Sequence, residues 1–265
     1  MSDMPLIAEM ETSVQRAAGR VLSGLAEEVQ SPSSSGMDRL AVMSAPLVPE
    51  IKLHLAEDAI LLWARLEAQL KTRLTAPFWA SAWVGGQGLA RYILDHPEVA
   101  RGRRVLDLGS GSGLVAIAAA MAGAREVVAN DIDPYAMSVI EMNARLNDVE
   151  VTGQRGSLLN SDGSGFDAVF AGDALYDGNL AGGVLPFLRR VTGHGGEVLI
   201  GDPRRGHLPD RELRVLATYR VTTMGALADS QIDNVTVFRM EPAMGRRGVR
   251  LARSSAADDQ RQETA

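Results

Sequence analysis

The stretch V-L-D-L-G-S-G-S-G-L, residues 105–114, decides the fold class of this chain. Its first residues have the apolar character of a buried strand, and the glycines that follow are typical of a tight turn before a helix. Residues 114–122 are rich in alanine and predict that helix. A strand, a glycine-rich turn and a helix in this order are typical of the nucleoside-binding unit of a doubly wound α/β sheet.

The charges around this turn indicate which nucleoside it binds. A second apolar run, residues 126–130, ends at Asp131, where a carboxylate accepts hydrogen bonds from ribose hydroxyls. Asp107 adds a carboxylate at the glycine turn, which repels a pyrophosphate and attracts a cationic ligand. We therefore expect S-adenosylmethionine, which carries ammonium and sulfonium charges. A phosphate-binding dinucleotide turn, or a glycine turn without a ligand, is the alternative.

Alternating strand and helix patterns around this unit predict the rest of the fold. We expect an α/β fold: a doubly wound, Rossmann-like, seven-stranded, mostly parallel sheet that ends in a C-terminal antiparallel hairpin, residues 219–224 and 234–240. The other expected strands begin at Arg104 or cover 126–130, 150–154, 166–171 and 197–200, and the expected helices begin at Leu114, at Pro134 with Asp133 as N-cap, and at Leu180.

The chain divides into four parts by pattern. Residues 1–40 read as an N-terminal arm, with a helix over 6–29, and a serine-rich linker. Residues 41–100 form a helical or lid segment with expected helices at 57–74 and 89–94. The expected α/β core is 101–242, and the polar, weakly patterned residues 243–265 predict a disordered tail.

Composition excludes several classes of protein. The chain has 265 residues, of which 46% are hydrophobic, enough for one large core. With no cysteine and four histidines at unpaired spacings, we expect no metal site. The net charge of -6 argues against a broad nucleic-acid surface. No apolar run approaches the roughly 20 residues of a membrane helix, and the acidic start lacks signal-peptide features, so we expect a cytoplasmic protein without membrane contact.

Ligands of open α/β sheets lie beyond the carboxyl ends of the strands, which gives the candidate site residues. Asp173 and Tyr176, in G-D-A-L-Y after the fourth strand, are the candidate catalytic residues; a plain turn aspartate and a packing aromatic are the alternatives. The candidate cofactor residues at the first three strand ends are Asp107, Gly109, Ser110, Gly111, Gly113, Asp131, Ile132, Ser157 and Leu158.

A further stretch, P-F-W-A-S-A-W-V-G-G-Q at residues 77–87, predicts a lid over the cofactor. We expect Trp83, Gly86 and Gln87 to contact the cofactor. Trp79 and Trp83 offer aromatic faces to a sulfonium or an alkylammonium, a cation–π contact of roughly 0.5 to 2 kcal/mol, and packing in the core is the alternative.

From about residue 46 to residue 240 the chain resembles the seven-strand class I methyltransferases, and within them the electron-transfer-flavoprotein β-subunit lysine methyltransferases. The resemblance is carried by the lid segment, by the glycine motif, by A-N-D-I-D-P at 129–134, by G-D-A-L-Y and by I-G-D-P at 200–203. The glycine motif indicates only the superfamily. The tryptophan segment together with D-x-x-Y, a hallmark of protein methyltransferases that modify lysine and a few other side chains, is narrower.

The resemblance implies S-adenosylmethionine contacts from Asp107, Gly109, Gly111 and Asp131, and a protein substrate, the electron-transfer-flavoprotein β-subunit. It also implies that Asp173 and Tyr176 face that substrate. We expect in-line methyl transfer to a lysine amine that Asp173 grips and aims, with Tyr176 as its hydrogen-bond partner. The alternatives are a ribosomal-protein lysine methyltransferase, a small-molecule N-methyltransferase such as one acting on nicotinamide, and a non-catalytic S-adenosylmethionine-binding module. The sequence predicts no oligomeric state.

Overall fold

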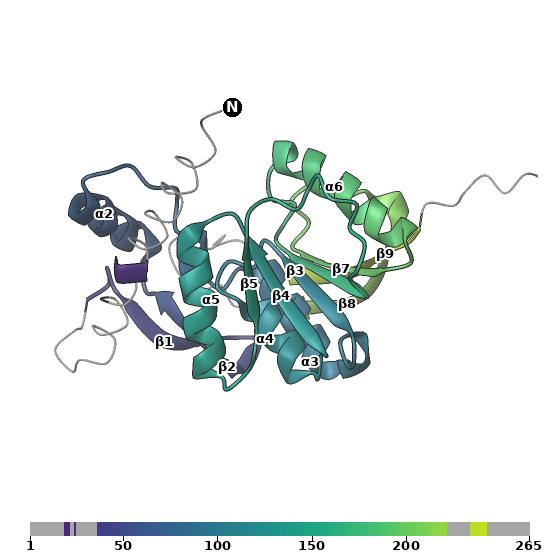
Figure 1. Cartoon of the computed structure of the whole chain (residues 1–265), viewed down its shortest axis with the longest axis horizontal. Coiled ribbons are helices and arrows are strands. Elements are labelled where there is room, and N and C mark those ends of the chain that lie inside the picture. The colour runs from purple at the N-terminus through teal and green to yellow at the C-terminus, as the bar shows by residue number, and fades with distance from the viewer. Residues whose placement is uncertain (1–18, 22–23, 25–35, 222–233, 243–265) are drawn as a thin grey trace, which may run out of the picture.

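The computed structural model describes residues 19–21, 24, 36–221 and 234–242. A seven-stranded sheet forms its centre (Figure 1), in the order β5-β4-β3-β6-β7-β9-β8. Neighbours from β5 to β7 pair in parallel, and β9 pairs antiparallel with β7 and β8, which confirms the predicted fold class. The strands are β3 (Arg104–Leu108), β4 (Glu126–Asp131), β5 (Thr152–Arg155), β6 (Ala168–Gly172), β7 (Glu197–Asp202), β8 (Leu213–Arg220) and β9 (Asn234–Met240).

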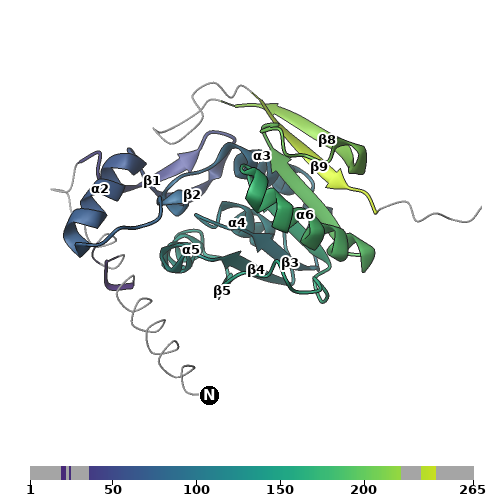
Figure 2. The same cartoon turned by 90° about the horizontal axis from the view of Figure 1, so that it is seen from above.

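Helices cover both faces of the sheet, as Figure 2 shows. Helices α3 (Val84–Asp95), α4 (Leu114–Met121) and α5 (Pro134–Leu146) lie on one face, and α6 (Gly178–Gly193) lies on the other. Side chains of each central strand alternate between the two faces: Val105 packs with the first group of helices and Leu106 with α6. Because both faces are buried, these strands read as continuous apolar runs.

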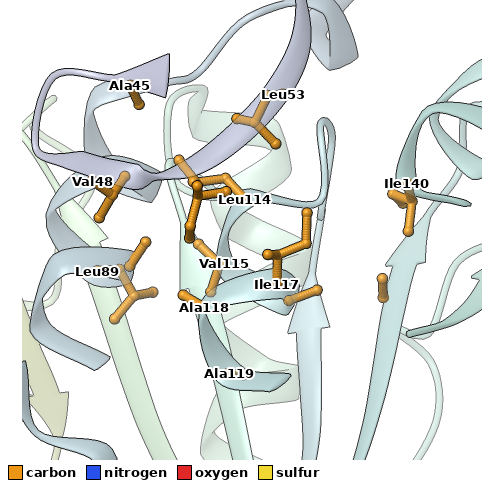
Figure 3. Packing of buried hydrophobic residues seen from close by; sticks show 14 of the residues in the cluster. Ala45, Val48, Leu53, Leu89, Leu114, Val115, Ile117, Ala118, Ala119 and Ile140 are labelled. Atoms are coloured by element: carbon orange, nitrogen blue, oxygen red, sulfur yellow. The ribbon is translucent and has the colours of Figure 1, made fainter. Parts of the chain in front are cut away.

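A β-hairpin, β1 (Leu40–Ala45) and β2 (Val48–Ala56), packs on the outer side of these three helices and is followed by α2 (Ala59–Leu70). In Figure 3, Val48 and Leu53 of this hairpin lie over Leu89 of α3 and Leu114 of α4. The expectation of a helical segment from residue 41 was therefore wrong at its start. Burial in β2 alternates only from Ile51 onward, so the period-2 signal of a half-buried strand is short.

A single asparagine connects the hairpin to the glycine-rich turn. Asn143 of α5 accepts hydrogen bonds at its Oδ1 from the backbone N–H of His54, at 2.8 Å, and lies 2.9 Å from the ring Nδ1 of His54. Its Nδ2 donates to the carbonyl oxygen of Ser112, at 2.8 Å. Asn143 has no exposed surface, so these bonds stabilise the junction of three separate segments.

Helix ends account for two further differences. Asp133 caps α5 as predicted, but α6 begins at Gly178 because Asp177 accepts from the backbone N–H groups of Asn179 and Leu180. Helix α3 begins at Val84, five residues before the expected start at Leu89. Its first turn contains Gly85 and Gly86, which have low helix propensity and concealed the start.

Close backbone contact explains those glycines. A Cβ atom on Gly85 would overlap the carbonyl oxygen of Gly201 in β7, and a Cβ atom on Gly172 of β6 would lie 2.7 Å from the Cα atom of Gly86. Helix α3 therefore meets the carboxyl ends of β6 and β7 backbone to backbone. This contact places the N-terminus of α3 beside the residues that follow those strands.

The C-terminal antiparallel pair is longer than expected. Strand β8 begins at Leu213, six residues before the predicted start at Tyr219, and it lies at the edge of the sheet. None of its residues is fully buried, so its apolar pattern is weak. The predicted 6–29 helix, apart from residues 19–21 and 24, and the 243–265 tail lie outside the described residues. Within the residues that are described, no helix has the length and apolar character needed to cross a membrane.

Candidate active site

A cavity of about 650 Å³ opens at the carboxyl ends of β3, β4 and β6. This is the edge at which the topology of an open α/β sheet places a ligand. The walls are the glycine-rich turn, the turns after β4, β5 and β6, the lid segment before α3, the first turns of α6 and one loop residue after β7. The lining includes Phe78, Trp79, Trp83, Gly109, Gly111, Asp131, Ile132, Ser157, Leu158, Asp173, Tyr176 and Arg205.

The glycine-rich turn runs between β3 and α4 with three glycines at positive φ: 69° at Gly109, 53° at Gly111 and 85° at Gly113. L-residues with a side chain rarely adopt this conformation. Asp131 accepts from the backbone N–H of Gly111 at Oδ2, at 2.9 Å, and from the N–H of Asp133 at Oδ1, at 3.0 Å. Each oxygen of Asp131 keeps one acceptor position for a ligand hydroxyl.

Asp107 lies beneath the turn and outside the cavity lining. Its Oδ2 accepts from the hydroxyl of Ser110, at 2.5 Å, and from the backbone N–H of Ala116, at 3.0 Å. Burial raises the pKa of Asp107 to about 7, although both hydrogen bonds favour the ionised form. Asp107 is therefore an internal anchor between the turn and the first turns of α4.

This raised pKa makes the stability of the ligand-free protein depend on pH. Between about pH 4 and pH 7 the unfolded state has lost the proton of Asp107 while the folded state keeps it, so stability falls as the pH rises through this window. We expect the Asp107→Asn variant, which carries no such proton, to lose this slope. Above pH 7, the stability that Asp107→Asn gains from losing this slope has an upper limit on the order of 4 kcal/mol. Thermal melting of both proteins from pH 4.5 to pH 8 tests this; parallel curves would contradict it.

Asp173 occupies the turn after β6 in a left-handed conformation, with a φ of 52°, and only 6% of its surface is exposed. Its Oδ2 accepts from the backbone N–H groups of Gly85 and, at 3.2 Å, Gly86, in the first turn of α3. Trp83, the N-cap residue of α3, makes no side-chain capping bond, so Asp173 caps this helix from 88 positions away.

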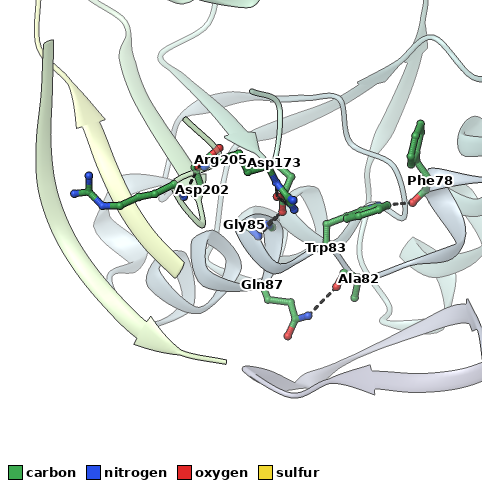
Figure 4. Close-up of polar contacts among 10 residues, drawn as sticks. Phe78, Ala82, Trp83, Gly85, Gln87, Asp173, Asp202 and Arg205 are labelled. Atoms are coloured by element: carbon green, nitrogen blue, oxygen red, sulfur yellow. Dashed lines mark hydrogen bonds and ion pairs between the residues drawn. The ribbon is translucent and has the colours of Figure 1, made fainter. Parts of the chain in front are cut away.

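The other oxygen of Asp173 is bound by Arg205, as Figure 4 shows. Nε and Nη2 of Arg205 donate to Oδ1 at 3.1 and 2.8 Å. Burial raises the pKa of the Asp173 carboxyl, and the charge and hydrogen bonds of Arg205 oppose that rise. Only 16% of the Arg205 side chain is exposed, so this loop arginine is not simply solvated.

Three aromatic rings from two segments, the lid segment and the turn after β6, meet beside Asp173. Phe78 lies 5.6 Å from the ring of Trp83 and 5.7 Å from the ring of Tyr176, between ring centroids. The indole N–H of Trp83 donates to the carbonyl oxygen of Phe78, at 2.8 Å. Phe78 and Tyr176 are 43% and 47% exposed, which is unusual for large apolar side chains and typical of a binding surface. Burial raises the pKa of Tyr176, so its hydroxyl is protonated at neutral pH.

The structure separates the predicted site residues into two groups. The cavity brings together Trp83, Gly109, Gly111, Asp131, Ile132, Ser157, Leu158, Asp173 and Tyr176. The other five, all described by the structure, lie outside its lining: Gly86, Gln87, Asp107, Ser110 and Gly113.

These five residues do not face a ligand in this cavity. Each makes a different contact. Gly86 donates to Asp173, and Ser110 donates to Asp107. The side chain of Gln87 turns away from the cavity and donates to the carbonyl oxygen of Ala82, at 2.7 Å (Figure 4). Gly113 packs against Ile140, and a Cβ atom on Gly113 would lie 3.4 Å from Cγ1 of Ile140.

Sequence reasoning missed Arg205, Phe78 and the α6 residues Leu180 and Val184 as part of the wall. The signal for Arg205 is local. Asp202, at the end of β7, accepts from the backbone N–H groups of Arg204 and Arg205 at 2.6 and 3.0 Å, an Asx turn at the very strand end where ligand-facing residues occur. No group of three or more acidic or histidine side chains that could hold a metal ion is present among the described residues, and the expectation of a metal-free site stays a prediction.

The chain is similar to known methyltransferases. A family model described as ribosomal protein L11 methyltransferase (PrmA) matches residues 90–171. The electron transfer flavoprotein beta subunit lysine methyltransferase of Xenopus laevis is 38% identical over 217 residues, covering 80% of this chain and 87% of that protein. The protein of the same name from Danio rerio is 43% identical over 175 residues, covering 65% and 67%.

Two other similarities are more limited. The ribosomal protein L11 methyltransferase of Thermotoga petrophila is 47% identical, but over 68 residues, 26% of each chain. Among solved structures, the ribosomal protein L11 methylase of Lactobacillus delbrueckii subsp. bulgaricus is 24% identical with a TM-score of 0.42, covering 58% of this chain and 77% of that chain. Over the greater part of the chain, the similarity is thus to the electron transfer flavoprotein beta subunit lysine methyltransferases.

Proposed function

The chain belongs to the electron transfer flavoprotein β subunit lysine methyltransferase family, and from this premise we propose that it transfers methyl groups from S-adenosylmethionine to lysine side chains of that β subunit. One observation carries the proposal to this chain's own residues. A single cavity joins the glycine-rich turn, where a nucleoside fits, to Asp173, Tyr176 and the aromatic rings, where an alkyl amine fits.

The cofactor half of the cavity has the chemistry that S-adenosylmethionine needs. Gly109 has open space where a Cβ atom would stand, so a ligand can approach the turn backbone closely. Asp131 offers acceptors to a ribose, while Ile132 and Leu158 offer apolar surface to an adenine. When bound, S-adenosylmethionine supplies an electrophilic methyl group on a sulfonium.

The substrate half suits a lysine side chain. Phe78, Trp83 and Tyr176 provide faces for the aliphatic arm and for a cationic amine, a contact of roughly 0.5 to 2 kcal/mol each. The hydroxyl of Tyr176 is a hydrogen-bond partner for the amine. Asp173 orients this region by binding the N-terminus of α3. This role replaces the direct grip on the amine expected from the sequence, because N–H donors occupy both oxygens of its carboxylate.

The reaction we propose is a direct in-line displacement. The lysine Nζ first loses a proton to water, which at pH 7 costs about 4.6 kcal/mol for an unperturbed amine. Its lone pair then forms the N–CH₃ bond as the S–CH₃ bond breaks, and S-adenosylhomocysteine leaves. The walls of the cavity exclude water and hold the amine in line, and positioning of this kind supplies most of the acceleration.

Intact-mass analysis tests the proposal. Recombinant electron-transfer-flavoprotein β subunit is incubated with S-adenosylmethionine and this protein, and in parallel with the Asp173→Ala variant. We expect methyl-sized increments with the native protein only, located on lysine by peptide mapping.

Absence of any increment, with cofactor binding intact by calorimetry, would contradict the proposed substrate. The same assay with ribosomal protein L11 and with nicotinamide then separates the remaining alternatives. Methylation of all substrates at similar rates would contradict specificity for the β subunit. The predicted cytoplasmic location, and the predicted absence of nucleic-acid and membrane contacts, stay predictions.

We expect Asp131→Ala to weaken cofactor binding by about 10- to 100-fold, because hydrogen bonds to a charged acceptor contribute about 1.5 to 3 kcal/mol. The loss of the Gly111 contact adds to the effect. Asp131→Asn keeps an acceptor for Gly111 and should bind with intermediate affinity. Calorimetric titration with S-adenosylhomocysteine measures the dissociation constants, and equal values for all three proteins would exclude a ribose contact.

A further inference from the structure

We propose that Arg205 is a positioning residue of this site: its guanidinium group fixes the Asp173 carboxylate against the N-terminus of α3 and balances its charge beside the substrate amine. The inference rests on the proposed methyl-transfer function and adds to it a residue from the loop after β7. Three observations lead to it: the donor count at Asp173, the way the loop places Arg205, and the charge that an amine meets in the cavity.

The first observation is that both oxygens of Asp173 are fully used. Gly85 and Gly86 donate to Oδ2, and two nitrogens of Arg205 donate to Oδ1. All four partners are N–H donors, so the arrangement requires the ionised carboxylate, which only accepts. A protonated oxygen would set its O–H against one of these donors. Arg205 and the helix end therefore hold the side chain of Asp173 from opposite sides.

The second observation is that Arg205 is itself placed by the fold. Asp202 is 1% exposed, and its Oδ1 turns the chain by accepting from two consecutive backbone N–H groups. Arg204 takes a left-handed conformation, with a φ of 67°, and its guanidinium lies 5.2 Å above the ring of Phe238. The turn thus sends Arg205 into the cavity, with 16% of its side chain exposed, and leaves Arg204 55% exposed.

The third observation is electrostatic. A buried carboxylate without a counter-charge stabilises the ammonium form of a nearby lysine and opposes the proton loss that the reaction needs. Arg205 balances that charge, while Asp202 acts in the opposite sense on Asp173. The first turn of α3 contributes amide dipoles and no acidic side chain. Tyr176 lies on the same turn after β6 as Asp173, and Asp131 and Asp133 line the same cavity.

Two arginines in one turn give a matched pair of variants. Arg205→Met removes the charge and keeps much of the volume, Arg205→Lys keeps the charge without the two-nitrogen geometry, and Arg204→Met makes the same change outside the cavity. We expect Arg205→Met to lower kcat on the β subunit by at least about 30-fold, since small errors of placement have effects of this size.

The pH profile of kcat distinguishes positioning from general damage to the loop. Without Arg205, the pKa of Asp173 and that of the bound amine both rise, so the acidic limb should move by about one pH unit or more to higher pH. Arg205→Lys should restore the limb, and Arg204→Met should match the native profile. Equal loss of kcat in both methionine variants, with no shift of the limb, would overturn the proposal.

A measurement without substrate keeps this outcome separate from the proposed function. The ¹³Cγ signal of Asp173, assigned by its absence in Asp173→Asn, is titrated by NMR in the native, Arg205→Met and Arg204→Met proteins. We expect a higher midpoint only in Arg205→Met. The same midpoint in all three would overturn the role of Arg205. If the midpoint is higher in Arg205→Met but the native protein does not methylate the β subunit, the contact between Arg205 and Asp173 is supported and the proposed substrate is contradicted.

Discussion

The Asp173→Ala variant is expected to lose methyl transfer by at least about 100-fold, the largest effect that a single substitution should have on this reaction. The variant loses the cap of α3 and the ion pair with Arg205. Without them, the wall beside the amine also loses its orientation. Cofactor affinity should change by less than about threefold, because Asp131 and the glycine-rich turn lie at other strand ends. Single-turnover kinetics and calorimetric binding measure the two quantities.

The same variant should also be less stable, by about 3 kcal/mol or more, because it leaves the mostly buried Arg205 without its carboxylate. Asp177→Ala is a suitable control, since it removes a capping carboxylate from the same turn, at the start of α6. Its loss should cost about 1 kcal/mol and leave turnover within about threefold. Near-native turnover of Asp173→Ala would remove Asp173 from the mechanism.

The second large effect is expected from Gly85→Ala. The new Cβ atom would overlap the carbonyl oxygen of Gly201 and lie 2.7 Å from the backbone nitrogen of Asp173, and neither atom can move without shifting the sheet. Overpacking of this kind destabilises by about 1 to 3 kcal/mol, and contact with a backbone places the variant at the upper end. A fall in Tm of roughly 6 to 12 °C follows for a chain of this size. Activity should also fall, because the displaced N-terminus of α3 no longer binds the Asp173 carboxylate.

Gly86→Ala is the matched control. Its Cβ atom would lie 3.8 Å from Val115, an ordinary contact, and alanine favours the helix by up to about 1 kcal/mol over glycine. We expect equal or slightly greater stability and an unchanged cofactor dissociation constant, since Gly86 lies outside the cavity lining. Equal destabilisation by both alanines, in parallel thermal melts, would contradict the backbone contact between α3 and β7.

Sequence patterns located the central strands because both faces of those strands are buried. Val105 and Leu106 are both fully buried, on opposite faces of the sheet, so the apolar run was unambiguous. The edge strand β8 and the hairpin β1–β2 were misplaced or missed because they alternate weakly. The start of α3 was missed for a different reason: its cap, Asp173, is distant in sequence and leaves no local signal.

The site shows the same division. Gly109, Asp131 and Asp173 lie at the carboxyl ends of three neighbouring parallel strands, β3, β4 and β6, so topology alone brings them to one edge. Gln87 was assigned from its place in the lid segment, but which way a helical side chain points depends on the rotation of α3, which the contact of Gly85 with Gly201 determines. Arg205 could not be predicted from the sequence, because its place in the site depends on two features of the fold. The ends of β6 and β7 are neighbours, and the Asx turn at Asp202 directs Arg205 into the cavity.

The link through Asn143 has a consequence for hydrogen exchange. The amide of His54, in the outer hairpin, is held by the same side chain that holds the glycine-rich turn at Ser112. A ligand that orders the turn must therefore slow the opening of that amide, by thermodynamic linkage. In exchange experiments with and without S-adenosylhomocysteine, His54 should gain protection and Leu40, at the far strand of the hairpin, should gain little. Protection of His54, which lies outside the cavity lining, would then report that the cavity is occupied.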